Sequence, residues 1–139
     1  MRNAPKRDLL HADLTRSVIG AFYRVYNRLD YGFLESIYAE ALSRVLLKSG
    51  HEVRREVGIV VYFEGEAIGL QRVDMIVDGL LIVEIKSSHD VSKSSHRQLM
   101  SYLRGSEMEV GLLLHFGPRP DFYRVVNTRS PRFIQADPR

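Results

Sequence analysis

Three charged residues stand within two otherwise apolar runs in the middle of the chain. Asp74 lies in the first run, and Glu84 and Lys86 lie in the second. Charged side chains are costly to bury unless they pair with each other or bind a metal ion. Two neighbouring carboxylates suit Mg²⁺, which uses one or two protein carboxylates and keeps several waters. Such an ion can activate water and stabilise the charge that builds on a phosphate during hydrolysis.

The sequence Asp78-Gly79 between the two runs predicts the turn of a β-hairpin. Side chains two apart on a strand point to the same face, so Glu84 and Lys86 share a face, and Asp74 can approach them from the neighbouring strand. Lys86 could then position the attacking water or neutralise the phosphate. The alternative is an edge-strand ion pair of Glu84 with Lys86 or Arg72, facing water.

Apolar periodicity predicts the elements that must position this hairpin. The expected elements are helices over residues 8–29 and 33–48, strands over 56–63, 67–77 and 80–87 in an antiparallel meander, a helix over 94–103, a buried strand over 109–116 and a short edge strand over 122–127. In the second helix Ile37 is expected to face inward with Tyr38 and Leu42. Strands this apolar favour an α/β fold with helices on both sides of a mixed sheet.

The 139 residues are enough for one domain with one core. We expect a flexible N-terminus over residues 1–7, a single domain over 8–127 and a basic, loosely ordered tail over 128–139. The absence of cysteine excludes disulfides, thiolate zinc sites and cysteine nucleophiles. The absence of cysteine also fits a cytoplasmic protein, and there is no apolar run that could span a membrane and no secretory signal. The net charge of +3 permits nucleic-acid binding but does not require it.

Other polar residues are weaker candidates for a functional site. The five histidines show no paired metal spacing. His115 is expected to be structural at a strand end, and the other histidines are expected to lie on the surface. The serines within 87–95 are interpreted as a flexible polar linkage, because no base partner is indicated. Some basic side chains could contact a phosphate backbone or simply be solvated, namely Lys93, Arg97 and Arg104 near the third helix and five arginines after Pro118.

Two further pairs lie on the predicted helices. Glu35 and Tyr38 are one turn apart, and Gln98 and Tyr102 are four apart and share a helix face. Each also has a purely structural interpretation, since an acid suits the first helical turn, tyrosine suits the core and glutamine suits the surface. Gly32-x-x-Glu35-x-x-Tyr38 nevertheless resembles the signature of the GxxExxY protein family, which is placed in the PD-(D/E)XK nuclease superfamily.

The resemblance extends in order over residues 13–127. Asp74, Glu84-Ile-Lys86 and Gln98-x-x-x-Tyr102 match motifs of that superfamily, and residues 110–117 resemble the family's closing strand and turn. There are departures: the turn before the signature reads Leu29-Asp-Tyr-Gly32, Tyr26 stands where a histidine is frequent, and Val73 replaces the proline before the first acid. None of these removes a catalytic group.

The resemblance implies a restriction-endonuclease-like αβββαβ core, with a mixed central sheet flanked by helices and preceded by an extra N-terminal helix. Glu35, Asp74 and Glu84 would bind Mg²⁺ or Mn²⁺ directly or hold water bound to the metal, and the carbonyl of Ile85 could also bind the ion. Lys86 would be the catalytic lysine. Gln98 and Tyr102 would orient the site or approach the phosphate backbone.

The activity implied by the resemblance is metal-dependent hydrolysis of nucleic acid, with DNA expected rather than RNA. The alternative is a non-catalytic module that keeps the fold and binds a nucleic acid or a protein. No membrane association is expected. An exposed edge strand near residues 122–127 could pair with a second copy to form a homodimer.

Overall fold

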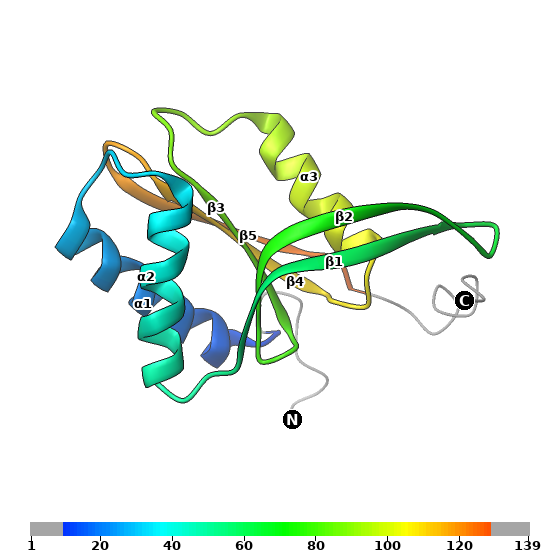
Figure 1. The fold of residues 1–139 in the computed structure, drawn as a ribbon, viewed down its shortest axis with the longest axis horizontal. Helices are drawn as coiled ribbons and strands as arrows, with labels where there is room; N and C mark the ends of the chain where they lie inside the picture. The colour runs from blue at the N-terminus through cyan, green and yellow to red at the C-terminus, as the bar shows by residue number, and fades with distance from the viewer. Residues whose placement is uncertain (1–9, 129–139) are drawn as a thin grey trace, which may run out of the picture.

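A computed structural model describes residues 10–128, so the expected flexible N-terminus (1–7) and residues 129–139 of the expected tail lie outside the described residues. The order of elements is α1 (Ala12–Leu29), α2 (Glu35–Lys48), β1 (Val53–Phe63), β2 (Glu66–Val77), β3 (Leu81–Lys86), α3 (Lys93–Arg104), β4 (Val110–Phe116) and β5 (Pro120–Val126), as Figure 1 shows. This order confirms the predicted α/β fold with its additional first helix. Within residues 10–128, no helix is both long and apolar enough to cross a membrane.

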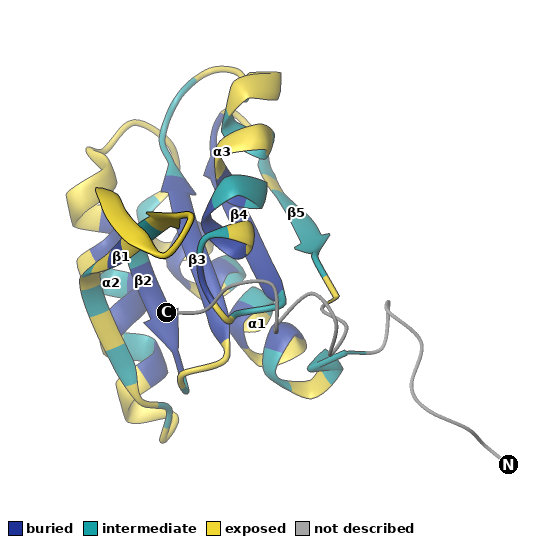
Figure 2. Ribbon diagram, turned by 90° about the vertical axis from the view of Figure 1, so that its right-hand side faces the viewer, coloured by how far each residue is buried: buried dark blue, intermediate teal, exposed yellow. Residues whose placement is uncertain are grey.

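The five strands form one mixed sheet in the order β1-β2-β3-β4-β5. All neighbours are antiparallel except β3 and β4, which are parallel because α3 connects them as a crossover. One face packs against α1 and α2 through side chains such as Val83 and Leu112, and the other packs against α3 through Ile82 and Leu113. Figure 2 shows the buried strands between these two layers of helices. The predicted edge strand is therefore β5, at one border of the sheet.

The first two helices differ in detail from the prediction. α1 begins at Ala12, not at residue 8, because His11 has a left-handed backbone (φ 54°) that cannot continue into a helix. α2 begins at Glu35, two residues later than predicted. The inward orientation predicted for Ile37 is wrong, since 42% of that residue is exposed. The core face of α2 is centred on Tyr38 and Leu42, which are fully buried, and Ile37 lies to one side of it.

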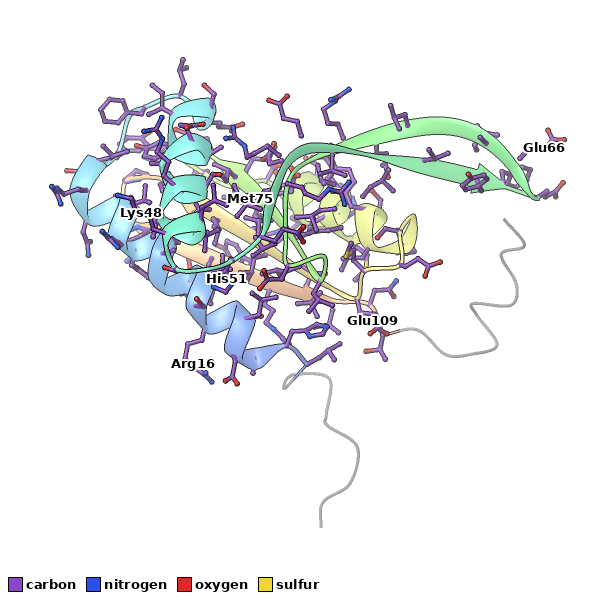
Figure 3. The ribbon with its side chains drawn as sticks, turned by 60° about the horizontal axis from the view of Figure 1, so that its bottom comes forward. Arg16, Lys48, His51, Glu66, Met75 and Glu109 are labelled. Carbon is purple, nitrogen blue, oxygen red and sulfur yellow. The ribbon has the colours of Figure 1, made fainter. Side chains whose placement is uncertain are left out.

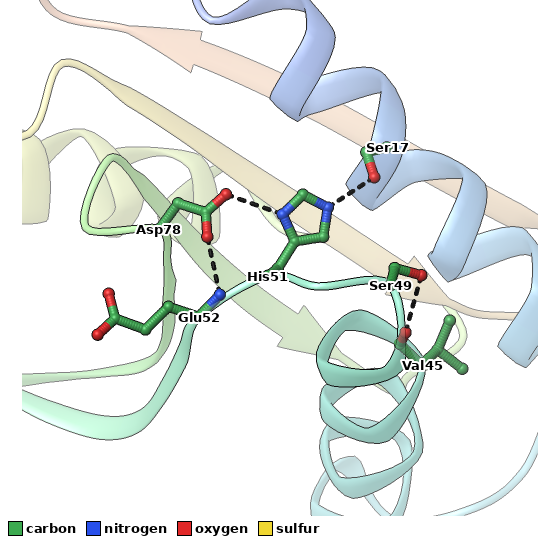
Figure 4. Close-up of polar contacts among 6 residues, drawn as sticks. All are labelled: Ser17, Val45, Ser49, His51, Glu52 and Asp78. Carbon is green, nitrogen blue, oxygen red and sulfur yellow. Dashed lines mark hydrogen bonds and ion pairs between the residues drawn. The ribbon is translucent and has the colours of Figure 1, made fainter.

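The Asp78-Gly79 turn is confirmed, and the Asp78 side chain connects distant parts of the chain. Both residues have positive φ (55° and 66°), as a type I′ hairpin turn requires. Asp78 accepts a hydrogen bond from Nδ1 of His51 at 2.8 Å, and the other imidazole nitrogen contacts the Ser17 hydroxyl at 2.8 Å (Figure 4). The surface role predicted for His51 is therefore wrong: it is a partly buried link between the turn and α1.

The β1–β2 hairpin is longer than the sheet that it joins. β2 pairs with β3 only through Met75, Ile76 and Val77, whereas its remaining length pairs with β1 alone. Figure 1 shows the two strands projecting from the sheet as a ribbon, and Figure 3 shows Glu66 at the free end of that ribbon. β2 and β3 therefore separate immediately before Met75, at Asp74.

Candidate active site

Two carboxylates lie where β2 and β3 separate. The main-chain N–H of Asp74 donates to Oε2 of Glu84 at 2.8 Å, and the N–H of Ile85 donates to Oδ2 of Asp74 at 2.8 Å. These two side-chain oxygens thus take the place of the main-chain carbonyls that would accept the N–H groups if the pairing of β2 with β3 continued. Within the described residues, no protein group donates to the second oxygen of either carboxylate. Each acid is held in place by one oxygen, and its other oxygen is free to contact a ligand.

Burial makes this pair of acids unusual. Glu84 is only 5% exposed and Asp74 is half-buried. Burial, followed by repulsion from Asp74, raises the pKa of Glu84 from its ordinary 4.5 to about 8. Burial also raises the pKa of Asp74, to which repulsion from Glu35 adds. The site therefore holds a proton more readily than two exposed carboxyl groups would.

Lys86 ends β3 on the same face as Glu84, and its charge opposes part of the rise in the pKa of Asp74 and Glu84. The alternative of an ion pair with Glu84 does not hold. The ion pairs within residues 10–128 include neither Glu84 nor Lys86, and Arg72 donates to the Glu56 carbonyl at 3.4 Å. The carboxylate pair thus faces a nearby cation that does not neutralise it by direct contact.

Glu35 approaches from the start of α2. Its Oε2 accepts the main-chain N–H of Ser87 at 3.0 Å, and its charge raises the pKa of both Asp74 and Glu84. However, the part of the chain that the structure describes has no group of three or more His, Cys, Asp or Glu side chains placed to bind one metal ion. Asp74 and Glu84 are therefore the close pair, and Glu35 lies at the side of the site.

Ser87 was not predicted as a site residue, because the serines within 87–95 were interpreted as a flexible polar linkage. Its N–H holds Glu35, and its hydroxyl donates to the Phe33 carbonyl at 2.5 Å. These two bonds attach the end of β3 to the loop before α2. The only sequence signal for them is its position directly after Lys86, where a strand ends beside a helix N-terminus.

The spacing of Gly32, Glu35 and Tyr38 has a structural explanation. Gly32 has φ 119°, a conformation that other residues rarely adopt. The Tyr38 hydroxyl donates to the Asp30 carbonyl and accepts the N–H of Phe33 at 3.2 Å. The Tyr38 ring is fully buried and stacks on Phe116 with centroids 4.0 Å apart. Tyr38 therefore fixes the loop that positions Glu35.

The pair expected on α3 is divided between two environments. Tyr102 is 5% exposed, and burial together with the charges of Glu84 and Asp74 raises its pKa to about 12. Tyr102 is thus close enough to the carboxylates for their charges to affect it. Gln98, one turn earlier, is exposed, as are Lys93, Arg97 and Arg104 on the same helix. The structure brings Tyr102 to the site and leaves Gln98 in solvent near it.

Two other predictions concern residues around the site. The predicted structural role of His115 agrees with its burial and with the bond that its Nε2 donates to the Ser88 carbonyl at 2.8 Å. Arg124, predicted among the cations after Pro118, instead lies in β5 and donates to the Leu10 carbonyl at 2.5 Å. Arg129, Arg132 and Arg139 lie outside the described residues.

Comparisons with known proteins agree with this architecture. A family model described as the PD-(D/E)XK nuclease superfamily matches residues 12–125. A solved structure described as "Crystal structure of SSO0001" superposes with a TM-score of 0.53 at 22% sequence identity, covering 93% of this chain and 67% of that chain. At this identity the likeness supports the fold alone. A search of curated proteins found no match.

Proposed function

The chain belongs to the PD-(D/E)XK nuclease superfamily, and we propose that it is a nuclease that hydrolyses phosphodiester bonds with Mg²⁺ or Mn²⁺. The observation that carries this proposal is the pair of buried carboxylates, Asp74 and Glu84, each held through one oxygen by a main-chain N–H. Lys86 follows Glu84 on the same strand face. A purely structural cluster would be expected to pair its acids with basic side chains, and within residues 10–128 neither Asp74 nor Glu84 forms an ion pair.

The donor set fits a hard divalent cation, since it consists of carboxylate oxygens with raised pKa values that a bound cation would lower. Asp74 and Glu84 would bind the ion, with the Ile85 carbonyl as a further ligand and Glu35 assisting from α2. When bound, the ion would make water more acidic and stabilise charge on the phosphate.

The remaining roles follow from position and protonation. Lys86 would orient the attacking water or offset the charge that develops on the phosphate. Tyr102, with its pKa near 12, keeps its proton at neutral pH and can act as a hydrogen-bond donor. Gln98, exposed beside it, would approach the phosphate backbone. We expect DNA as the substrate rather than RNA.

The test is cleavage of single- and double-stranded DNA and RNA with Mg²⁺ or Mn²⁺, comparing the native protein with Lys86→Ala. We expect metal-dependent cleavage that EDTA abolishes and that Lys86→Ala lowers by about a hundred-fold or more. Lys48→Ala is the matched control, because Lys48 is exposed at the opposite end of α2 from Glu35 (Figure 3).

Absence of cleavage by the folded native protein with either metal would overturn the proposal. Calorimetry separates the remaining alternative, a non-catalytic module. Such a module would bind nucleic acid without binding metal, and Asp74→Asn would leave that binding unchanged. The nuclease would bind the metal, and Asp74→Asn would weaken metal binding while keeping an oxygen to accept the N–H of Ile85.

A further inference from the structure

We propose that the loop before α2 is a stacking platform for an unpaired base of the nucleic acid, beside the phosphodiester to be cut. The platform consists of Tyr31, Phe33 and Leu34. The inference rests on the proposed nuclease function and specifies its substrate: single-stranded nucleic acid, or a single-stranded end or gap.

A pocket of about 630 Å³ lies at this loop, lined by Tyr31, Gly32, Phe33, Leu34, Glu35, Ser36 and Ser87. Its size is in the range of about 300–1,000 Å³ that is usual for sites of small organic groups. Two of its lining residues adjoin the candidate active site, since Ser87 directly follows Lys86 and its N–H donates to Glu35 at 3.0 Å. A strand with its phosphate at the carboxylates would thus have a neighbouring nucleotide at this pocket.

The pocket presents aromatic and aliphatic surface to solvent. Tyr31 is 42% exposed, Phe33 43% and Leu34 71%. Aromatic rings beside a backbone-binding site are the usual means of holding single-stranded nucleic acid, because every base has a flat face that can stack on them. The pocket lining also includes the polar residues Ser36 and Ser87.

The loop is fixed in position before any ligand arrives. Its main chain is bonded at Phe33 to both Ser87 and Tyr38, and at Tyr31 to the Asp30 side chain at 2.8 Å. The Phe33 ring meets the buried Tyr38 ring edge-on, with centroids 6.0 Å apart. Binding a base would therefore order few additional groups, which favours affinity.

An unpaired base is the occupant that suits this position. In a duplex the bases are already stacked and paired, and removing one takes a few kcal/mol. A fixed ring outside the duplex can contact a base only after that step, whereas a single strand offers its bases directly. The platform thus predicts a preference for single strands in both binding and cleavage.

The test measures binding of a single-stranded oligonucleotide that contains the fluorescent base 2-aminopurine, in the Lys86→Ala background so that cleavage is slow during the measurement. We expect Phe33→Ala and Tyr31→Ala each to weaken binding, roughly five- to 150-fold, as loss of one base–aromatic stack does. Phe33→Tyr keeps the ring and should restore binding. Phe63→Ala is the matched control, because Phe63 is an even more accessible aromatic residue, 60% exposed, at the far end of β1.

Equal binding of the single strand by the parent and by both alanine variants would overturn the inference, as would binding of a duplex of the same sequence as tightly as the single strand.

Failure of the nuclease proposal gives a different set of results. If no substrate is cut but binding still depends on Tyr31 and Phe33, the stacking platform is supported and the nuclease proposal is wrong. If single strands are cut equally well by the native protein and by the Tyr31→Ala and Phe33→Ala variants that retain Lys86, the nuclease proposal is supported and the stacking platform is wrong. A pocket that serves a peptide partner would bind no oligonucleotide, which also overturns the inference.

Discussion

Oε2 of Glu84 accepts the main-chain N–H of Asp74 at 2.8 Å, so the second acid of the site holds the strand that carries the first. The relationship is almost reciprocal, because Asp74 accepts the N–H of Ile85, the residue after Glu84. The two acids therefore close the sheet where β2 and β3 separate, and they repel each other as they do so. The same two carboxylates therefore affect both the stability of the fold and the binding of a ligand.

Glu84→Gln should stabilise the metal-free protein at alkaline pH. Folding raises the pKa of Glu84 from 4.5 to about 8, so between these values the folded protein holds a proton that the unfolded chain has lost. The free energy of unfolding must then fall as the pH rises, by up to about 1.4 kcal/mol per pH unit. Glutamine cannot ionise but can still accept the N–H of Asp74, so the variant loses this slope.

Urea denaturation in EDTA at several values between about pH 5 and pH 8 measures the slope. Some slope should remain in Glu84→Gln, because the pKa of Asp74 is raised in the same direction. Glu66→Gln, at the exposed end of β2, is the control and should keep the native slope. A Glu84→Gln variant that is less stable than the native protein at pH 8 would instead support a structural role for the charge.

Mg²⁺ or Mn²⁺ should raise the melting temperature, and by more at about pH 8 than at about pH 6. A cation binds the ionised carboxylate, so below the pKa of Glu84 it must first displace a proton. The apparent affinity should rise by up to about tenfold per pH unit in this range. Thermal denaturation with and without metal measures the effect. Asp74→Asn, which weakens metal binding, should reduce the effect, and Asp13→Asn, on the exposed side of α1, should not. A shift independent of pH would place the cation elsewhere.

The hairpin and the sheet could be predicted because their signals are local. Asp78-Gly79 supplies two residues that tolerate positive φ, and the runs on either side are too apolar to face water. The parallel pairing of β3 and β4 follows from a helix between two buried strands. The acids and Lys86 could likewise be assigned to neighbouring strands before their contacts were known.

The contacts themselves could not be predicted, because they join residues that are distant in sequence. The bond from Ser87 to Glu35 spans 52 positions, and the bonds of His51 reach Ser17 and Asp78. Nothing in the alternation of β2 indicates that it leaves β3 at Asp74. The exposure of Ile37 depends on how α2 is rotated against the sheet, which one helix pattern determines only approximately.

Gly117→Ala should destabilise the protein through His115. A Cβ at Gly117 would lie 2.5 Å from Cε1 and 2.6 Å from Nε2 of the imidazole, and 3.0 Å from the Ser88 carbonyl. The ring is buried and bonded to that carbonyl, so it has little room to move. Overpacking of this kind costs about 1–3 kcal/mol. Gly20→Ala is the control, because a Cβ there meets nothing within 4 Å and alanine favours a helix by about 0.5–1 kcal/mol. Urea denaturation should therefore shift the two variants in opposite directions.

Tyr38→Phe should loosen the loop before α2 while leaving the core packed. The ring would keep its stack on Phe116, but the Asp30 carbonyl and the N–H of Phe33 would lose the hydroxyl that joins them. A lost hydrogen bond of this kind costs about 0.5–1.5 kcal/mol.

Hydrogen exchange at the Phe33 amide locates the effect of Tyr38→Phe. The amide should exchange faster in the variant than in the native protein, whereas amides of the central strand β4 should lose no more protection than the drop in global stability explains. Tyr23→Phe is the matched control, because the Tyr23 ring packs against Phe22 and its hydroxyl makes no hydrogen bond among residues 10–128. Unchanged protection at Phe33 in Tyr38→Phe would mean that Ser87, not Tyr38, holds this loop in place.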